Sequence, residues 1–213
     1  MKDIVILGNG GFSKEVAFLI DSINKVNKEW NILGYITNDS SLINTFNGKY
    51  KIYNADEWLI ENKTELNVAI GMGSPHITSK IISKLKENNN LAFPNLIHPN
   101  VVADWELISL GVGNIICAGN IFTIDIKIGS FNIFNLDCTL GHDSIIGDFN
   151  VFNPSINISG GVKLGNQNLV GTGVQILQFL NICNHNTIGA GAVVTKDITE
   201  EGTYVGLPAK KIK

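Results

Sequence analysis

The sequence predicts an α/β domain over residues 1–98 followed by a parallel β-helix domain over residues 99–213. Two observations predict this fold class. In the first part, short apolar runs alternate with longer amphipathic stretches, which is the rhythm of strands and helices in a parallel α/β unit. From residue 99 the helical pattern disappears, and an apolar residue recurs at every sixth position instead.

In the first domain, strands are expected in the runs DIVILG, ILGYIT and NVAIGMG, and helices over residues 13–26, 55–63 and 74–88. Ser13 and Ser74 are expected to cap two of these helices, with Pro75 at the first helical position of the second. Both helices begin just after a glycine-rich strand end. Parallel sheets of this kind bind ligands at such strand ends.

The six-residue repeat dominates the second domain. Its apolar positions are Leu110, Ile116, Phe122, Ile128, Phe134, Leu140, Ile146, Phe152, Ile158, Leu164, Val170, Ile176, Ile182, Ile188 and Val194. Glycine often follows the apolar residue, and asparagine recurs four places after it. This pattern predicts short strands joined by tight bends, in which a positive φ costs glycine and asparagine little. Three such sides close one coil, and about five coils stack without an inserted loop.

A glycine-rich loop, GNGG at residues 8–11, follows the first expected strand and opens a helix. Backbone amides and the helix dipole attract phosphate at such a position. The dinucleotide fingerprint requires a third glycine where this chain has Ser13, so a nicotinamide cofactor is disfavoured. The alternative is a tight turn from strand to helix that binds no ligand.

An imidazole and a carboxylate lie side by side in the segment TLGHDSIIGDFN. Because Leu140 points inward and Gly141 bends, His142 and Asp143 are expected on the outer surface of a corner, and Ser144 turns back. A lone surface histidine is usually only a solvated side chain. Adjacent residues of a strand point apart, so a contact between the two side chains requires the bend after Gly141 or a partner from another chain.

Composition excludes several classes of function. A formal net charge of −3 and a pI near 5.8 provide no basic surface for nucleic acid. The chain has no apolar run long enough to span a bilayer and no signal-peptide core, so membrane insertion is not expected and the cytoplasm is the expected location. Three cysteines without CxxC spacing (Cys117, Cys138 and Cys183) are expected to be buried thiols.

Three further histidines (His76, His98 and His185) are expected to be structural or solvated. The solenoid histidines lack the close paired spacing of a metal site, so no metal is expected.

The segments VILGNGGFSKEV, AIGMGSPHITSKI, NLIHPNVV, GHDSIIGDF and YVGLPAKKI carry a resemblance over essentially the whole chain. The chain resembles bacterial sugar acyltransferases related to sialic-acid O-acetyltransferase, and most of all those that N-acetylate nucleotide-linked 4-amino-4,6-dideoxy sugars. The resemblance implies a left-handed β-helix, a homotrimer with active sites between neighbouring chains, acetyl-coenzyme A as donor, and a role in surface glycan synthesis such as O-antigen.

The resemblance also implies roles for particular residues. His142 is the catalytic base and Asp143 orients it. Gly10, Gly11, Phe12, Asn38, Asp39 and Gly71 bind the UDP- or dTDP-linked sugar, and backbone at Gly160 and Ala190 contacts the coenzyme. Relatives commonly have histidine where this chain has Phe12 and Val151. These departures leave the identity of the sugar and the affinity for the coenzyme open.

Two other functions stay open at this stage. One is O-acetylation of a hydroxyl on a sialic-acid-type sugar, which uses the same base and the same groove. The other is a non-catalytic trimeric solenoid that holds a sugar nucleotide or a partner enzyme, a reading encouraged by Phe12 and Val151.

Overall fold

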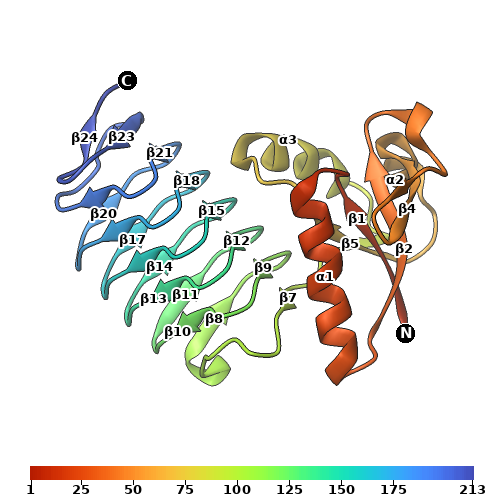
Figure 1. Cartoon of the computed structure of the whole chain (residues 1–213), viewed down its shortest axis with the longest axis horizontal. Helices are drawn as coiled ribbons and strands as arrows, with labels where there is room; N and C mark the ends of the chain where they lie inside the picture. The colour runs from red at the N-terminus through yellow and green to blue at the C-terminus, as the bar shows by residue number, and fades with distance from the viewer. The chain divides into compact units, whose positions relative to one another are not determined.

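The computed structural model describes all 213 residues of the chain. The chain forms two compact units, Met1–Pro99 and Asn100–Lys213 (Figure 1). This division lies one residue after the expected domain boundary.

The first unit is built on a sheet whose strand order is β3-β4-β2-β1-β5-β6. Only β3 is antiparallel to its neighbour. The strands of the sheet are β1 (Lys2–Leu7), β2 (Trp30–Thr37), β3 (Phe46–Asn47), β4 (Tyr50–Ala55), β5 (Leu66–Ile70) and β6 (Leu91–Ala92), and β7 (Leu96–Ile97) follows them in the chain. The helices are α1 (Gly11–Val26), α2 (Asp56–Glu61) and α3 (Pro75–Leu85), with a short 3₁₀ helix η1 (Ser40–Leu42).

The middle of this sheet places three loops at one edge. β1 pairs in parallel with β2 on one side and with β5 on the other, with Leu7 opposite Ile36 and Ile70. Residues Ile4–Leu7 are fully buried or nearly so, as expected for a parallel strand covered on both faces. The carboxyl ends of the three strands therefore lie together, and the loops that follow them can form one site.

The first helix begins two residues earlier than its expected cap. α1 starts at Gly11 with Gly10 at the cap position, so the prediction that Ser13 caps the helix is wrong. Ser13 is fully buried in the first turn, and its hydroxyl donates a hydrogen bond to the carbonyl of Gly71 at 2.9 Å. Ser74 does occupy the cap position of α3, ahead of Pro75, but its side chain makes no capping hydrogen bond.

The second unit is a left-handed β-helix, and the fold prediction is confirmed (Figure 1). Its first face contains β8 (Ile108–Leu110), β11 (Ile126–Ile128), β14 (Ile145–Ile146), β17 (Lys163–Leu164) and β20 (Asn181–Ile182), preceded by the 3₁₀ helix η2 (Trp105–Leu107). The second face contains β9 (Ile115–Ile116), β12 (Ile133–Phe134), β15 (Val151–Phe152), β18 (Leu169–Val170), β21 (Thr187–Ile188), β23 (Thr203–Val205) and β24 (Lys210–Lys211). The third contains β10 (Ile121–Phe122), β13 (Thr139–Leu140), β16 (Asn157–Ile158), β19 (Gln175–Ile176) and β22 (Val193–Val194).

The six-residue repeat is the core of this unit. Phe122 pairs with Leu140, and Leu140 pairs with Ile158 in the next coil. Every predicted inward residue is buried except Leu110 in the first coil, which is half-buried. Stacked apolar side chains thus fill the space between the three faces.

The corners correct one part of the sequence interpretation. Positive φ occurs at the third place after every inward residue from Leu110 to Ile188, as at Asp143 and Phe179, and not at the first place or at the asparagines of the ladder. Glycine is needed at the first place for a different reason. A Cβ added to Gly141 would lie only 2.5 Å from the amide nitrogen of Gly160 in the next coil.

The recurring asparagines form a ladder at the corner between the first and second faces, which we call the asparagine corner. Its members are Asn114, Asn132, Asn150, Asn168 and Asn186, and all are fully buried or nearly so. The Oδ1 atom of Asn132 accepts the backbone N–H and the side-chain amide of Asn150 at 2.9 and 3.0 Å. Each asparagine repeats this pattern with the next coil, so buried backbone amides are satisfied at every turn.

Candidate functional site

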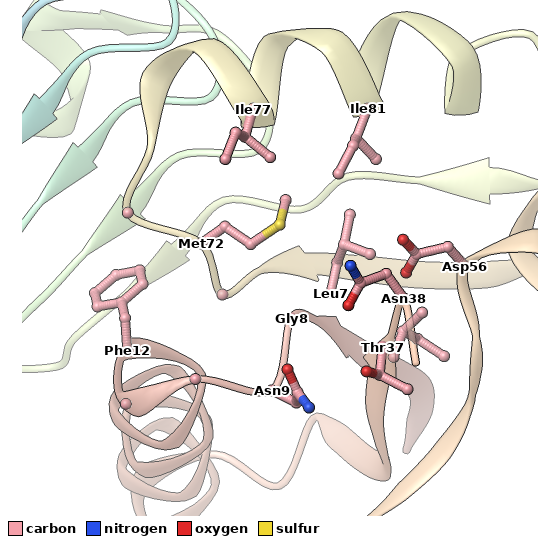
Figure 2. A pocket seen from close by; sticks show the side chains of 15 residues that line it. Leu7, Gly8, Asn9, Phe12, Thr37, Asn38, Asp56, Met72, Ile77 and Ile81 are labelled. Carbon is pink, nitrogen blue, oxygen red and sulfur yellow. The ribbon is translucent and has the colours of Figure 1, made fainter. Parts of the chain in front are cut away.

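A cavity of about 400 Å³ opens at the strand-end edge of the α/β unit (Figure 2). It is lined by Leu7, Gly8, Asn9, Gly10, Gly11, Phe12, Ile36, Thr37, Asn38, Asp56, Gly71, Met72, Gly73, Ile77 and Ile81. The loops after β1, β2 and β5 supply most of this lining, while α3 supplies Ile77 and Ile81 as an apolar wall.

The glycine loop of the cavity is held closely against the loop after β5. Gly8 has a φ of +109°, and a Cβ there would lie 2.9 Å from the Cγ of Met72. The loop leads into α1, whose first turn carries no acidic side chain. A 16-residue helix whose N-terminal turn carries no acidic side chain favours an anion such as phosphate.

Five of the six residues expected to bind the sugar nucleotide line this cavity: Gly10, Gly11, Phe12, Asn38 and Gly71. Asp39 does not line it. Its carboxylate accepts hydrogen bonds from the backbone N–H and the hydroxyl of Ser41 at 3.0 and 2.6 Å, which lower the pKa of the Asp39 carboxyl. The carboxylate of Asp39 therefore stabilises η1.

Asp56 is a lining residue that the sequence interpretation missed. It is the first residue of α2, directly after β4, and its side chain is half-buried. Burial raises the pKa of the Asp56 carboxyl, and the charge of Glu57 adds to the effect. In the sequence, Asp56 stands at the start of an expected helix and is followed by Glu57, a pattern typical of an ordinary helix N-terminus. Only the fold shows that Asp56 lines a cavity.

The solenoid brings His142 and Asp143 together at the corner between its third and first faces, which we call the histidine corner. The Nδ1 atom of His142 lies 2.7 Å from the Oδ2 atom of Asp143. Asp143 has a φ of +60°, so the bend within one chain is sufficient to turn the two adjacent side chains toward each other. Both side chains are more than half exposed, at 56% and 66%.

The imidazole of His142 lies against the backbone of Gly160, one coil further on. A Cβ added to Gly160 would lie 2.7 Å from the Nε2 and Cε1 atoms of the ring. The carbonyl of His142 accepts a hydrogen bond from the N–H of Gly161 at 2.7 Å. Glycine at 160 thus leaves space for the ring, whose side chain is more than half exposed.

Two of the other histidines lie on the surface of the chain. His76 is exposed in the first turn of α3, and His185 is exposed at the asparagine corner. No group of three or more histidine, cysteine, aspartate or glutamate side chains is arranged to hold a metal ion. Cys117 and Cys138 are buried, and burial raises the pKa of the Cys138 thiol to about 11, whereas Cys183 is only half-buried. None of the helices is both long and apolar enough to cross a membrane.

Comparisons with known proteins agree with both halves of this architecture. The family model described as the PglD N-terminal domain matches residues 3–85. The acetyltransferase domain of PglB from Neisseria gonorrhoeae is 25% identical over 100% of both chains, with a TM-score of 0.87, and a second structure of it contains acetyl coenzyme A. WeeI from Acinetobacter baumannii is also 25% identical over 100% of both chains, with a TM-score of 0.85.

The chain is similar over its whole length to sugar acetyltransferases of the hexapeptide-repeat type, and the family model covers its first unit. The resemblance inferred from the sequence motifs is therefore confirmed. PerB from Caulobacter crescentus, crystallised with CoA and GDP-perosamine, has the same fold, with a TM-score of 0.87 at 24% identity over 100% of this chain and 98% of that one. No curated protein sequence gives a significant match.

The two residues that the resemblance assigns to the coenzyme lie at different corners of the single chain. Gly160 is at the histidine corner beside His142, whereas Ala190 is exposed at the third corner, between β21 and β22. A face of the solenoid separates these two corners. Val151, one of the two departures that the resemblance implies, is only 5% exposed, so its side chain is not presented to solvent.

Proposed function

We propose that this protein transfers the acetyl group of acetyl-coenzyme A to the amino group of a 4-amino-4,6-dideoxy sugar carried on a nucleoside diphosphate. The observation that carries the proposal is the His142–Asp143 pair, set over Gly160 in a solenoid of the acetyltransferase fold. The resemblance implies UDP or dTDP as the carrier, and the Caulobacter relative is crystallised with a GDP sugar.

The pair is suited to accept a proton. When Nδ1–H of His142 donates to Asp143, Nε2 has a lone pair and acts as the base. The amine attacks the thioester carbonyl carbon, and its proton passes to Nε2 as the C–N bond forms. The tetrahedral intermediate then collapses, the C–S bond breaks, and the coenzyme thiolate takes the proton from the imidazolium. Asp143 stabilises that imidazolium while it exists.

The α/β cavity is proposed to hold the nucleotide. Its glycine loop and the N-terminus of α1 receive the diphosphate, which leaves Phe12 and the residues around it to contact the sugar. Phe12 gives the sugar an aromatic surface in place of a polar contact. A deoxygenated carbon of the sugar can pack against that surface.

A homotrimer is part of the proposal. Gly160 and Ala190 are both expected to contact the coenzyme, yet they lie at different corners of one solenoid. If two chains pack side by side, one supplies the histidine corner and its neighbour supplies the corner of Ala190. The site of each donor molecule is then shared, which supports assembly as a closed ring.

The proposal is tested by incubating the protein with acetyl-coenzyme A and a panel of nucleotide-linked amino sugars, followed by mass spectrometry. Acetylation of an amine and release of one equivalent of thiol are expected. Matched acceptors with a hydroxyl at the same carbon test O-acetylation. Binding of nucleotide sugars without binding of acetyl-coenzyme A in calorimetry would instead favour a non-catalytic solenoid.

A further inference from the structure

The two ends of the α/β cavity differ in charge. At one end, the glycine loop and the N-terminus of α1 favour an anion. At the other end, Asp56 directs a carboxylate toward the cavity, near Asn38 (Figure 2). Phe12 lies on the far side of the same view. A nucleotide sugar bound with its diphosphate on the loop therefore has its nucleoside at Asp56 and its sugar at Phe12.

The carboxylate of Asp56 has no hydrogen-bond partner in the chain. It is half-buried, and that partial loss of water is the main reason why its pKa is raised. A partly desolvated carboxylate without a partner is costly, and a ligand that donates hydrogen bonds to it removes that cost. Because the carboxylate repels phosphate, the group that contacts it is a donor-bearing part of the nucleoside.

The surroundings of Asp56 suit a planar ring. Leu7 and Ile81 lie on the same side of the cavity, which provides apolar surface for the face of a base. Asn38 supplies an amide that can both donate and accept at the edge of that base. Recognition of a base requires apolar surface against its flat face and hydrogen bonds to its polar edge, and this part of the cavity offers both.

Guanine fits the carboxylate better than uracil or thymine does. Guanine presents two adjacent donors, N1–H and the N2 amino group, which match the two oxygens of a carboxylate. Uracil and thymine present one N3–H between two carbonyls, so the second carboxylate oxygen would face a carbonyl oxygen. We propose that Asp56 selects a guanosine diphosphate carrier by accepting hydrogen bonds from N1–H and N2–H.

This inference rests on the proposed function, and it replaces the UDP or dTDP carrier with GDP. It is tested by calorimetric titration of the full-length protein with GDP, IDP and UDP. Inosine lacks only the N2 amino group of guanosine, so IDP isolates that single contact. The wild-type protein is expected to bind GDP at least about 10-fold more tightly than IDP, because the charge-assisted hydrogen bond from N2 is lost. UDP is expected to bind more weakly than GDP by a similar factor or more.

Two variants complete the design. Asp56→Asn is expected to weaken GDP about 10- to 100-fold and to leave IDP less affected, so that the preference for GDP disappears. The matched control is Glu57→Gln, which removes the neighbouring carboxylate from an exposed position that does not line this cavity. It is expected to change the affinity for GDP less than twofold. If Asp56→Asn does not fold, the wild-type ratio of GDP to IDP affinity still decides the question.

Several results would overturn the proposal. Equal affinity for GDP and IDP, or tighter binding of UDP, excludes bidentate recognition of guanine. Equal weakening of all three nucleotides by Asp56→Asn would assign the carboxylate to the ribose hydroxyls, which the three ligands share. Acetyl transfer to a UDP-linked sugar with no response to GDP would end this inference and leave the proposed function intact, whereas absence of any nucleotide binding would contradict both.

Discussion

The asparagine corner and the histidine corner of the solenoid share one backbone conformation but differ in how their sequence varies. The asparagine corner repeats the same buried side chain in coil after coil, from Asn114 to Asn186. The histidine corner changes at each equivalent position, through Ile124, His142, Gly160 and Gln178. The asparagine that repeats in every coil therefore indicates a structural role. The corner whose residues differ from coil to coil can instead carry a residue with a catalytic role.

The physical reason lies in what each corner must satisfy. The ladder closes buried hydrogen bonds along one edge of the stack, so any change there leaves amides without partners. The histidine corner is exposed, and its backbone is already paired by N–H to C=O bonds between coils, as from Gly161 to His142. Side chains at the histidine corner can therefore vary without loss of the fold. A rigid scaffold can carry a reactive group at such a position.

The strongest test of this contrast is the replacement His142→Ala. Loss of the base is expected to reduce turnover about 10²- to 10⁴-fold while affinity for acetyl-coenzyme A stays near normal, because the ring contributes to the transition state. Turnover is measured by thiol release, and affinity by calorimetry.

The control is His185→Ala, which removes the exposed histidine of the asparagine corner. Its turnover is expected to stay within about twofold of the wild type. If both variants keep full turnover, the histidine corner is not the site of the chemistry.

The next largest effect is expected from Asn150→Ala, which breaks the ladder in the middle of the stack. The substitution removes the Oδ1 acceptor of the backbone N–H and the side-chain amide of Asn168, and it leaves Oδ1 of Asn132 with only the backbone N–H of residue 150. The expected cost is about 2–4 kcal/mol in the free energy of unfolding. The measurement is thermal unfolding followed by circular dichroism. Well below the melting temperature, the variant is expected to retain its acetyl-transfer activity, because the altered side chain lies at the asparagine corner and not at the histidine corner.

An exposed asparagine supplies the comparison for that variant. Asn166 lies at the same corner, and its Oδ1 accepts the N–H of Asp148 at 2.7 Å. Water can replace this bond, so Asn166→Ala is expected to cost less than about 1 kcal/mol. Similar costs for the two variants would show that burial is not what makes the ladder important.

A pair of glycine substitutions separates stability from activity within the histidine corner. In Gly160→Ala the atoms nearest the new methyl group belong to the movable ring of His142, so turnover is expected to fall about 10- to 100-fold with little change in melting temperature. In Gly141→Ala the methyl group meets the backbone of the next coil, so stability is expected to fall first. A Gly160→Ala enzyme with normal turnover would show that the resting position of the ring is not needed for reaction.

The sequence predicts the solenoid well because each coil repeats the same constraint. An inward apolar side chain at every sixth position has no other stable arrangement in a chain of tight bends, and the buried positions agree from Ile116 to Val194. The bends are less predictable. Phe149 and Phe179 adopt positive φ, which aromatic residues rarely do, because the coil geometry dictates the backbone there whatever the side chain.

The nucleotide cavity is only partly predictable for a related reason. The glycine loop has a local signature, so Gly10 and Gly11 are found from sequence alone. Asp56 reaches the cavity because the order of strands places β4 next to β2, and Ile81 reaches it from α3, which follows β5 next to β1. No local pattern encodes that neighbourhood. The cap predicted at Ser13 is wrong because the Ser13 hydroxyl donates its hydrogen bond to a carbonyl 58 residues away and does not cap its own helix.

The smallest effect on the histidine corner is expected from Asp143→Asn. The amide can still accept a hydrogen bond from Nδ1, but it cannot stabilise the imidazolium by charge. Because both side chains are more than half exposed, water and salt screen this contribution, and turnover is expected to fall only about 10-fold.

Two further measurements test whether the charge of Asp143 contributes to turnover: the turnover of Asp143→Glu, and the dependence of turnover on ionic strength. The longer carboxylate is expected to recover part of the lost turnover, because charge is restored with altered geometry. The ratio of wild-type to Asp143→Asn turnover is expected to decrease as the salt concentration rises. Salt screens the carboxylate of the wild type, whereas the neutral amide of the variant is not affected. A ratio that stays constant from low to high salt would assign Asp143 a purely orienting role, in which the hydrogen bond at 2.7 Å matters and the charge does not.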